Sequence, residues 1–99
     1  MITVLVLDAD PAVRLAAKRV LRPAGLTLIA VSDFSAAVAR LAVVRADLVM
    51  CDVDALAPDG TPAIEAIADI GASAQMLALF PKQRDTRAIA GYGLGKRLH

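Results

Sequence analysis

Two short apolar runs, each closing on an aspartate, place the strongest constraint on the fold of this chain. Ile2–Leu7 is a run of aliphatic and β-branched residues that stops at Asp8, and Leu48–Cys51 stops at Asp52. The second run is too short for a helix. Runs of this kind are typical of strands that are buried on both faces of a parallel sheet. The sequence therefore predicts carboxylates at the ends of two buried strands.

Helical patterns separate the strands. Asp10 can cap a helix whose first position is Pro11, because proline presets the backbone angle needed there. Ser32 or Asp33 caps a second helix. Thr61 and Pro62 open a third helix, and the two remaining strands are predicted over Leu26–Val31 and Gln75–Phe80. The residues expected to face the sheet are Val13, Ala16, Ala17, Val20 and Leu21, then Phe34, Ala37, Val38 and Leu41, then Ile64, Ile67 and Ala68.

Strict alternation of strands and helices predicts an α/β fold with a parallel sheet and helices on both of its faces. The 99 residues suit one domain, residues 1–99. The last segment has weak helical character over Arg84–Ala90 and then meets Gly91, Gly93 and Gly95, which disfavour a helix. We expect no fifth strand.

Charge and cysteine content exclude several functions. Eleven basic residues against ten acidic ones argue against a nucleic-acid groove, which needs clustered Lys and Arg. One Cys and one His cannot form a four-ligand zinc site, and Cys51 cannot form an internal disulfide. No membrane span or signal peptide can be identified. The sequence predicts a soluble cytoplasmic protein.

The carboxylates at the strand ends form the candidate site. In an open parallel sheet, ligands bind beyond the carboxyl ends of the strands, where Asp8 and Asp52 could meet. Two neighbouring carboxylates repel each other, and a hard cation such as Mg²⁺ relieves that repulsion. The alternative is that each aspartate only caps the following helix or turn.

From Ile2 to about Ala90, the chain resembles the receiver domains of two-component response regulators. Asp47–Val53 resembles the third strand of that family, which closes on the phosphoacceptor aspartate. Asp59-Gly60 follows at the family's spacing, and Asp10–Arg14 matches the usual opening of the first helix.

The resemblance implies a flavodoxin-like three-layer α/β/α sandwich with strand order 2-1-3-4 and the fifth strand missing or replaced. It implies that Asp52 accepts a phosphoryl group from a histidine kinase or a phosphotransfer protein, with Mg²⁺ offsetting charge during the transfer. The phosphoryl group then biases the faces around the third and fourth helices.

The metal ligands depart from the family's pattern. The family has two adjacent acids at the end of its first strand, and this chain has Asp8 followed by Ala9, so one direct ligand is lost. Asp10 is a weak substitute, because its place before Pro11 favours helix capping. The family's third ligand is a backbone carbonyl, which at Asp54 survives any side chain. The resemblance thus implies Mg²⁺ binding that is weakened.

The switch residues depart as well. Phe80 stands where the family has a Thr or Ser hydroxyl, and Pro81 follows it in place of a small residue. The family's lysine has no counterpart, since Lys96 comes too early for that role. The proline that usually follows the phosphoacceptor is replaced by Leu56, with Pro58 shifted later.

Three interpretations are open for Phe80: core packing, which we favour, filling of the pocket, or presentation to a partner. Pro81 holds it in extended geometry. Cys51 is expected to be an inert, small apolar residue. His99 stands at the chain end, which argues against a role as phosphodonor or ligand.

The sequence therefore favours a degenerate receiver that is not an enzyme and that works by binding a downstream protein. The second hypothesis is a working receiver that is phosphorylated on Asp52. A small flavodoxin-like enzyme or nucleotide binder is the third, and the lack of a glycine-rich loop after Asp8 argues against it. An uncovered fourth strand also predicts a homodimer through the side that holds this strand and the fourth helix.

Overall fold

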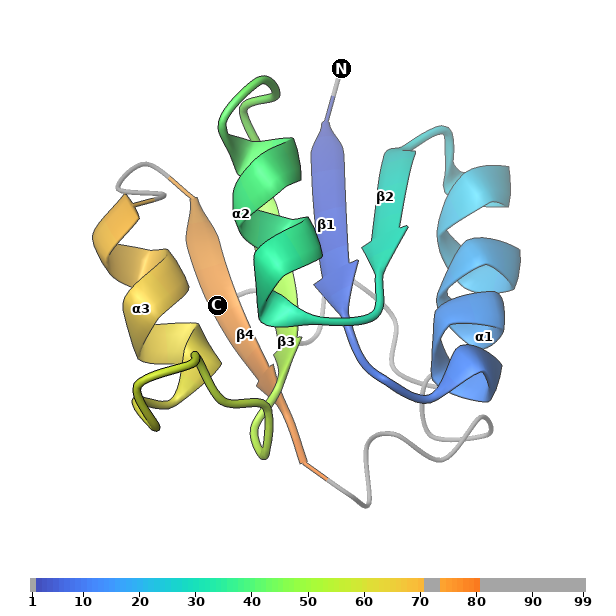
Figure 1. Cartoon of the computed structure of the whole chain (residues 1–99). Coiled ribbons are helices and arrows are strands. Elements are labelled where there is room, and N and C mark those ends of the chain that lie inside the picture. The colour runs from blue at the N-terminus through green and yellow to red at the C-terminus, as the bar shows by residue number, and fades with distance from the viewer. Residues whose placement is uncertain (1, 71–73, 81–99) are drawn as a thin grey trace.

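The computed structural model describes residues 2–70 and 74–80, which form a parallel sheet with helices on both faces (Figure 1). The elements in chain order are β1 (Thr3–Leu7), α1 (Pro11–Leu21), the 3-10 helix η1 (Arg22–Ala24), β2 (Thr27–Val31), α2 (Phe34–Leu41), β3 (Leu48–Asp52), α3 (Ala63–Ile70) and β4 (Gln75–Leu79). The predictions for Pro81, the helix at Arg84–Ala90, Lys96, His99 and a missing fifth strand lie outside the described residues.

The strand order is β2-β1-β3-β4 with all pairs parallel, so the predicted fold class and order are confirmed. Leu7 of β1 pairs with Val31 on one side and with Cys51 on the other. Asp52 of β3 pairs with Leu79 of β4. This register brings the carboxyl ends of the strands to one edge of the sheet.

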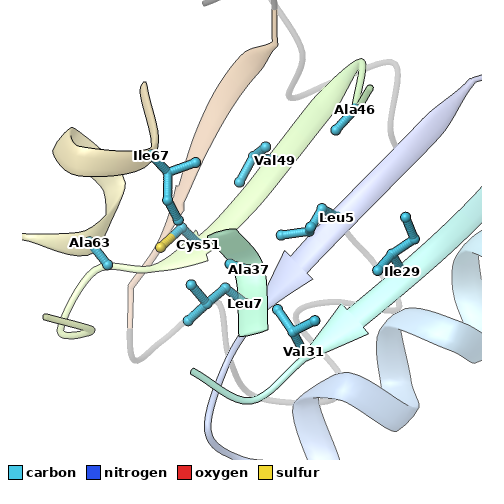
Figure 2. Close-up of a cluster of buried hydrophobic side chains, with 10 residues drawn as sticks. All are labelled: Leu5, Leu7, Ile29, Val31, Ala37, Ala46, Val49, Cys51, Ala63 and Ile67. Atoms are coloured by element: carbon cyan, nitrogen blue, oxygen red, sulfur yellow. The ribbon is translucent and has the colours of Figure 1, made fainter. Parts of the chain in front are cut away.

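Alternate side chains of β1 face opposite layers, which explains why Val4–Leu7 are all apolar. Val4 and Val6 pack in a cluster with residues of α1, whereas Leu5 and Leu7 pack toward α2 and α3. Figure 2 shows the second cluster, in which β1, β2 and β3 contribute side chains beneath Ala37 of α2. Both faces of the central strands are thereby removed from water.

The predicted helix faces are largely confirmed, with one error. The fully buried helical positions are Val13, Ala16, Ala17 and Leu21 of α1, Ala37 of α2, and Ala63 and Ile67 of α3. Ala68 was expected to face inward but is exposed. It lies one residue, or about 100°, beyond Ile67 on the helix and so leaves the buried stripe.

Side-chain caps start the first two helices, as the sequence indicates. The Asp10 carboxylate accepts a hydrogen bond from the Ala12 N–H at 2.9 Å, one residue into α1 from Pro11. The Asp33 carboxylate accepts from the Ala36 N–H at 2.8 Å, which identifies Asp33 rather than Ser32 as the cap of α2. Within the described residues, no helix is long and apolar enough to cross a bilayer.

Asp47 joins the amino ends of three strands. The hydrogen bond that its carboxylate accepts is expected to contribute about 1 kcal/mol to the free energy of unfolding. One of its carboxylate oxygens accepts a hydrogen bond from the Thr3 N–H at 2.8 Å, while its own backbone bonds to Thr3 and Gln75. Asp47→Ala removes only the carboxylate contact, and urea unfolding measures the loss. Asp47→Asn keeps an amide oxygen as acceptor and should retain most of the stability; equal losses in both variants would contradict this role.

Candidate functional site

Asp8 and Asp52 lie side by side at the carboxyl edge of the sheet. Leu7 of β1 pairs with Cys51 of β3, and Asp8 and Asp52 are the residues that directly follow this pair. Asp8 is completely buried, and Asp52 is 6% exposed. They are the buried charged residues of the part of the chain that the structure describes. The register therefore places the two residues next to each other at the strand ends, and a cation held between them stays a prediction.

Backbone N–H groups fix the orientation of both carboxylates. Oδ1 of Asp8 accepts a hydrogen bond from the Asp10 N–H at 2.9 Å, and Oδ1 of Asp52 accepts from the Asp54 N–H at 3.0 Å. In both cases the donor lies two residues on, so the chain turns directly after the strand. The two loops that leave the site are anchored on the very carboxylates that form it.

Position 9 contributes no carboxylate to this pair. Ala9 is exposed, and the neighbouring Asp10 uses its carboxylate oxygen to cap α1, as the sequence favoured. Among residues 2–70 and 74–80, no group of three or more His, Cys, Asp or Glu side chains is arranged to hold a metal ion. Mg²⁺ has six ligand positions, and in proteins one or two of them are usually filled by carboxylates and most of the others by water. The carboxylates of Asp8 and Asp52 could fill one or two of these positions. A contribution from the Asp54 carbonyl stays a prediction.

Arg14 is a member of the site that the sequence analysis did not assign. Its Nη1 donates to the backbone carbonyl of Asp8 at 2.7 Å and to that of Ala9 at 3.1 Å. The guanidinium thus ties α1 to the loop that follows β1. One signal was present: a base near the N-terminus of a helix is unfavourable for the helix dipole, so Arg14 needs a partner outside its helix.

Phe80 does not pack in the core, so the interpretation that we favoured for it is wrong. Its neighbour Leu79 is buried and ends β4, while Phe80 is 52% exposed. Just past the paired residues of β3 and β4, the Val53 N–H donates a backbone hydrogen bond to the Leu79 carbonyl at 3.0 Å. Phe80 therefore projects where the pairing ends, beside Val53 at the edge that holds Asp52. Contact with a partner stays a prediction.

The loop between β3 and α3 is closed by the turn predicted at Asp59-Gly60. The Asp59 carboxylate accepts a hydrogen bond from the Thr61 N–H at 3.0 Å, and this bond lowers the pKa of Asp59. Gly60 has φ +88°, a conformation that favours glycine. Leu56 and Pro62 form an antiparallel bridge across the loop. The loop has a defined shape that leaves the Leu56 side chain exposed.

Comparisons with known proteins bear on this arrangement. No protein-family model matches the sequence, and no curated protein matches it significantly. Among solved structures, the chemotaxis response regulator CheY4 of Vibrio cholerae matches with a TM-score of 0.69 and 22% identity over 92% of this chain and 81% of that one. A response regulator from Thermotoga maritima matches with a TM-score of 0.70 and 22% identity over 90% of this chain and 76% of that one.

A third match comes from the complex of the histidine kinase ThkA with the response regulator protein TrrA. It has a TM-score of 0.66 and 24% identity, and covers 82% of this chain and 70% of that one. The chain has the fold of a response-regulator receiver. In a receiver fold, Asp8, Asp52 and Phe80 stand at the carboxyl edge of the sheet, where ligands of open α/β sheets bind.

The buried Cys51, which directly precedes Asp52, is expected to make the stability of the fold depend on pH. Burial, followed by the negative charges of Asp52 and then Asp8, raises the pKa of the Cys51 thiol to about 12. The unfolded thiol ionises near its ordinary value of about 8.5. The native state therefore keeps a proton that the unfolded state releases, and stability falls as pH rises from about 9 to about 12.

We expect this fall to be smaller in Cys51→Ala. Urea unfolding of both proteins between about pH 8 and pH 11 gives the two slopes, and their difference isolates the thiol from other groups that titrate there. Parallel pH dependences would show that Cys51 does not retain its proton in the native state.

Proposed function

We propose that this chain is a receiver domain of a two-component response regulator, that it is degenerate, and that it acts in the cytoplasm by binding another protein rather than as an enzyme. The observation that carries the proposal is the end of β1. Position 9 is alanine, and the nearest substitute carboxylate, that of Asp10, caps α1 at 2.9 Å from the Ala12 N–H. The pair of Asp8 and Asp52 is left with weakened capacity for Mg²⁺.

The end of β4 supports the same conclusion. A phosphoryl group on Asp52 needs hydrogen-bond donors around it, and the residue after β4 is Phe80, whose side chain has no donor. Its exposed ring instead offers apolar surface beside the site. Exposed aromatic residues of this kind are enriched at protein interfaces.

The partner is proposed to be a downstream protein that binds on the side of β4. In the described residues β4 pairs with β3 alone, and its last residues lead to Phe80. The homodimer predicted through β4 and a fourth helix stays a prediction, because that helix lies outside the described residues. TrrA shows that a protein of this fold can be bound by a histidine kinase.

A working phosphoacceptor is the second candidate, because the reacting group itself is well placed. Asp52 ends the strand next to the one that Asp8 follows, one of its oxygens accepts from the Asp54 N–H, and part of its surface reaches solvent. In this case a histidine kinase or phosphotransfer protein is the phosphodonor. A bound Mg²⁺ supplies charge neutralisation for the transferred phosphoryl group.

Incubation with Mg²⁺ and acetyl phosphate, followed by intact-mass measurement, separates the two candidates. The degenerate receiver is expected to give no stoichiometric adduct, because the pocket lacks a metal ligand and a hydroxyl. A stoichiometric phosphoryl adduct that is absent from Asp52→Ala would overturn degeneracy and establish the second candidate. Asp54→Ala is the matched control, because its carboxylate lies two residues away in the same loop and its loss should leave any adduct unchanged.

A further inference from the structure

The charged side chains of residues 2–70 are sorted between the two ends of the sheet. Because all strands are parallel, the helices begin at the carboxyl end and finish at the amino end (Figure 1). The acidic end, at the carboxyl ends of the strands, holds Asp8, Asp10, Asp33, Asp52, Asp54, Asp59 and Glu65. The basic end, where the helices finish, holds Lys18, Arg19, Arg22, Arg40 and Arg45.

In the part of the chain that the structure describes, few charged side chains lie at the end where the opposite sign prevails. Arg14 lies at the acidic end, but its guanidinium bonds to backbone carbonyls there. Asp47 and Asp69 lie at the basic end, and the Asp47 carboxylate bonds to the Thr3 N–H. The exposed bases are therefore in excess at one end, and the exposed acids at the other.

Both ends also expose apolar side chains. Ile2, Val43 and Ile70 are exposed at the basic end, and Val43 is the extreme case at 80%. Leu56 and Phe80 are exposed at the acidic end. Apolar side chains surrounded by charges of one sign are a common composition for a protein-binding surface.

The turn after α2 presents the main features of the basic end in a fixed shape. The N–H groups of Val43 and Val44 both donate to the Arg40 carbonyl, at 3.1 and 2.9 Å. Arg40 and Arg45 flank Val43 in the sequence, and all three side chains are exposed. An exposed apolar side chain with an arginine on either side of it in the sequence suits a surface that offers carboxylates around an apolar patch.

We propose that the basic end of one copy of this chain binds the acidic end of the next copy, head to tail. Opposite charges at the two ends favour this contact, and like charges disfavour either end binding itself. The acidic end supplies carboxylates around Leu56 and Phe80, which matches the chemistry of the turn at Val43. This contact places the neighbouring copy over the edge that holds Asp52.

A head-to-tail contact uses two different surfaces, so it produces rings or growing chains rather than a closed symmetric dimer. Sedimentation equilibrium of the full chain at about 20 mM salt is expected to show an average mass that grows past the dimer with concentration. Salt screens exposed charges over about 10 Å at 0.1 M and about 3 Å at 1 M, so the dissociation constant should rise at least about tenfold by about 0.5 M.

Complementary variants test the direction of the contact. The basic-end variant carries Arg40→Gln and Arg45→Gln, and the acidic-end variant carries Asp54→Asn and Glu65→Gln. Each variant is expected to be monomeric alone, because it keeps one of the two binding surfaces and has lost the other surface that this one binds. Mixed together, they should form a complex that stops at one copy of each, through the acidic end of the first and the basic end of the second.

Arg40→Lys with Arg45→Lys is the matched control, since it keeps both charges and should associate like the unaltered chain. Thermal unfolding checks that every variant is folded. An unaltered chain that stays monomeric at several hundred micromolar and about 20 mM salt would overturn the proposal. So would a dimer that persists in both end variants, or folded variants that fail to combine when mixed.

Discussion

Ile67→Ala is expected to lower the free energy of unfolding by about 3 kcal/mol, the largest stability effect of any single change considered for this chain. Ile67 is completely buried between α3 and the sheet, where it packs with side chains of β1 and β3 (Figure 2). Truncation leaves a cavity that the surrounding strands cannot close. Small domains have a total stability of about 5–15 kcal/mol, so this loss is a large share.

Ile70→Ala removes the same atoms from the same helix and is the matched control. Ile70 lies three residues beyond Ile67 and is 55% exposed, so its truncation is expected to cost below about 1 kcal/mol. Urea unfolding of both variants gives the difference directly. Similar losses at the two positions would mean that α3 does not dock on the sheet through Ile67.

The sheet could be predicted from the sequence because its signal is local. The runs Val4–Leu7 and Leu48–Cys51, which end at Asp8 and Asp52, are apolar at every position, and the structure buries both sides of each. Order and direction then followed from the alternation with helices and from the resemblance to receivers. Caps such as Asp10 were also predictable, because a cap depends on residues within one helical turn.

Phe80 and Arg14 show where sequence reasoning fails. An aromatic residue after an apolar run is usually core, but β4 ends at Leu79 and the ring falls past the last paired residue. Strand ends are set by the neighbouring strand, which the run itself does not encode. The contact of Arg14 with the carbonyls of Asp8 and Ala9 depends on how the loop after β1 turns back toward the first turn of α1, and the unfavourable place of a base near a helix N-terminus was its one sequence signal.

The candidate site lies between these cases. Both strands that end at these aspartates, β1 and β3, could be recognised from the sequence, and their parallel pairing places Asp8 beside Asp52. The hydrogen bond from the Ala12 N–H shows that the Asp10 carboxylate caps α1, while its weak role as a metal ligand stays a prediction. In the proposed receiver, position 9 therefore decides how many carboxylates are available to Mg²⁺.

Ala9→Asp is expected to strengthen Mg²⁺ binding by at least about tenfold. Ala9 is exposed, so a carboxylate fits there without displacing core side chains. The added charge lies next to the pair of Asp8 and Asp52, and a charge pair about 4 Å apart contributes about 4 kcal/mol at an effective dielectric of 20, against about 1.4 kcal/mol for each tenfold in affinity. Calorimetric titration with MgCl₂ measures the two dissociation constants.

The same substitution should couple stability to the metal. Without Mg²⁺ the added carboxylate repels Asp8 and Asp52, which lowers the melting temperature, and with Mg²⁺ the repulsion is relieved and the order reverses. Ala9→Asn has the same shape without the charge and should show neither effect. If Ala9→Asp and Ala9→Asn bind Mg²⁺ equally, the missing acid at position 9 does not limit the site, and the degeneracy proposed here must have its cause at Phe80.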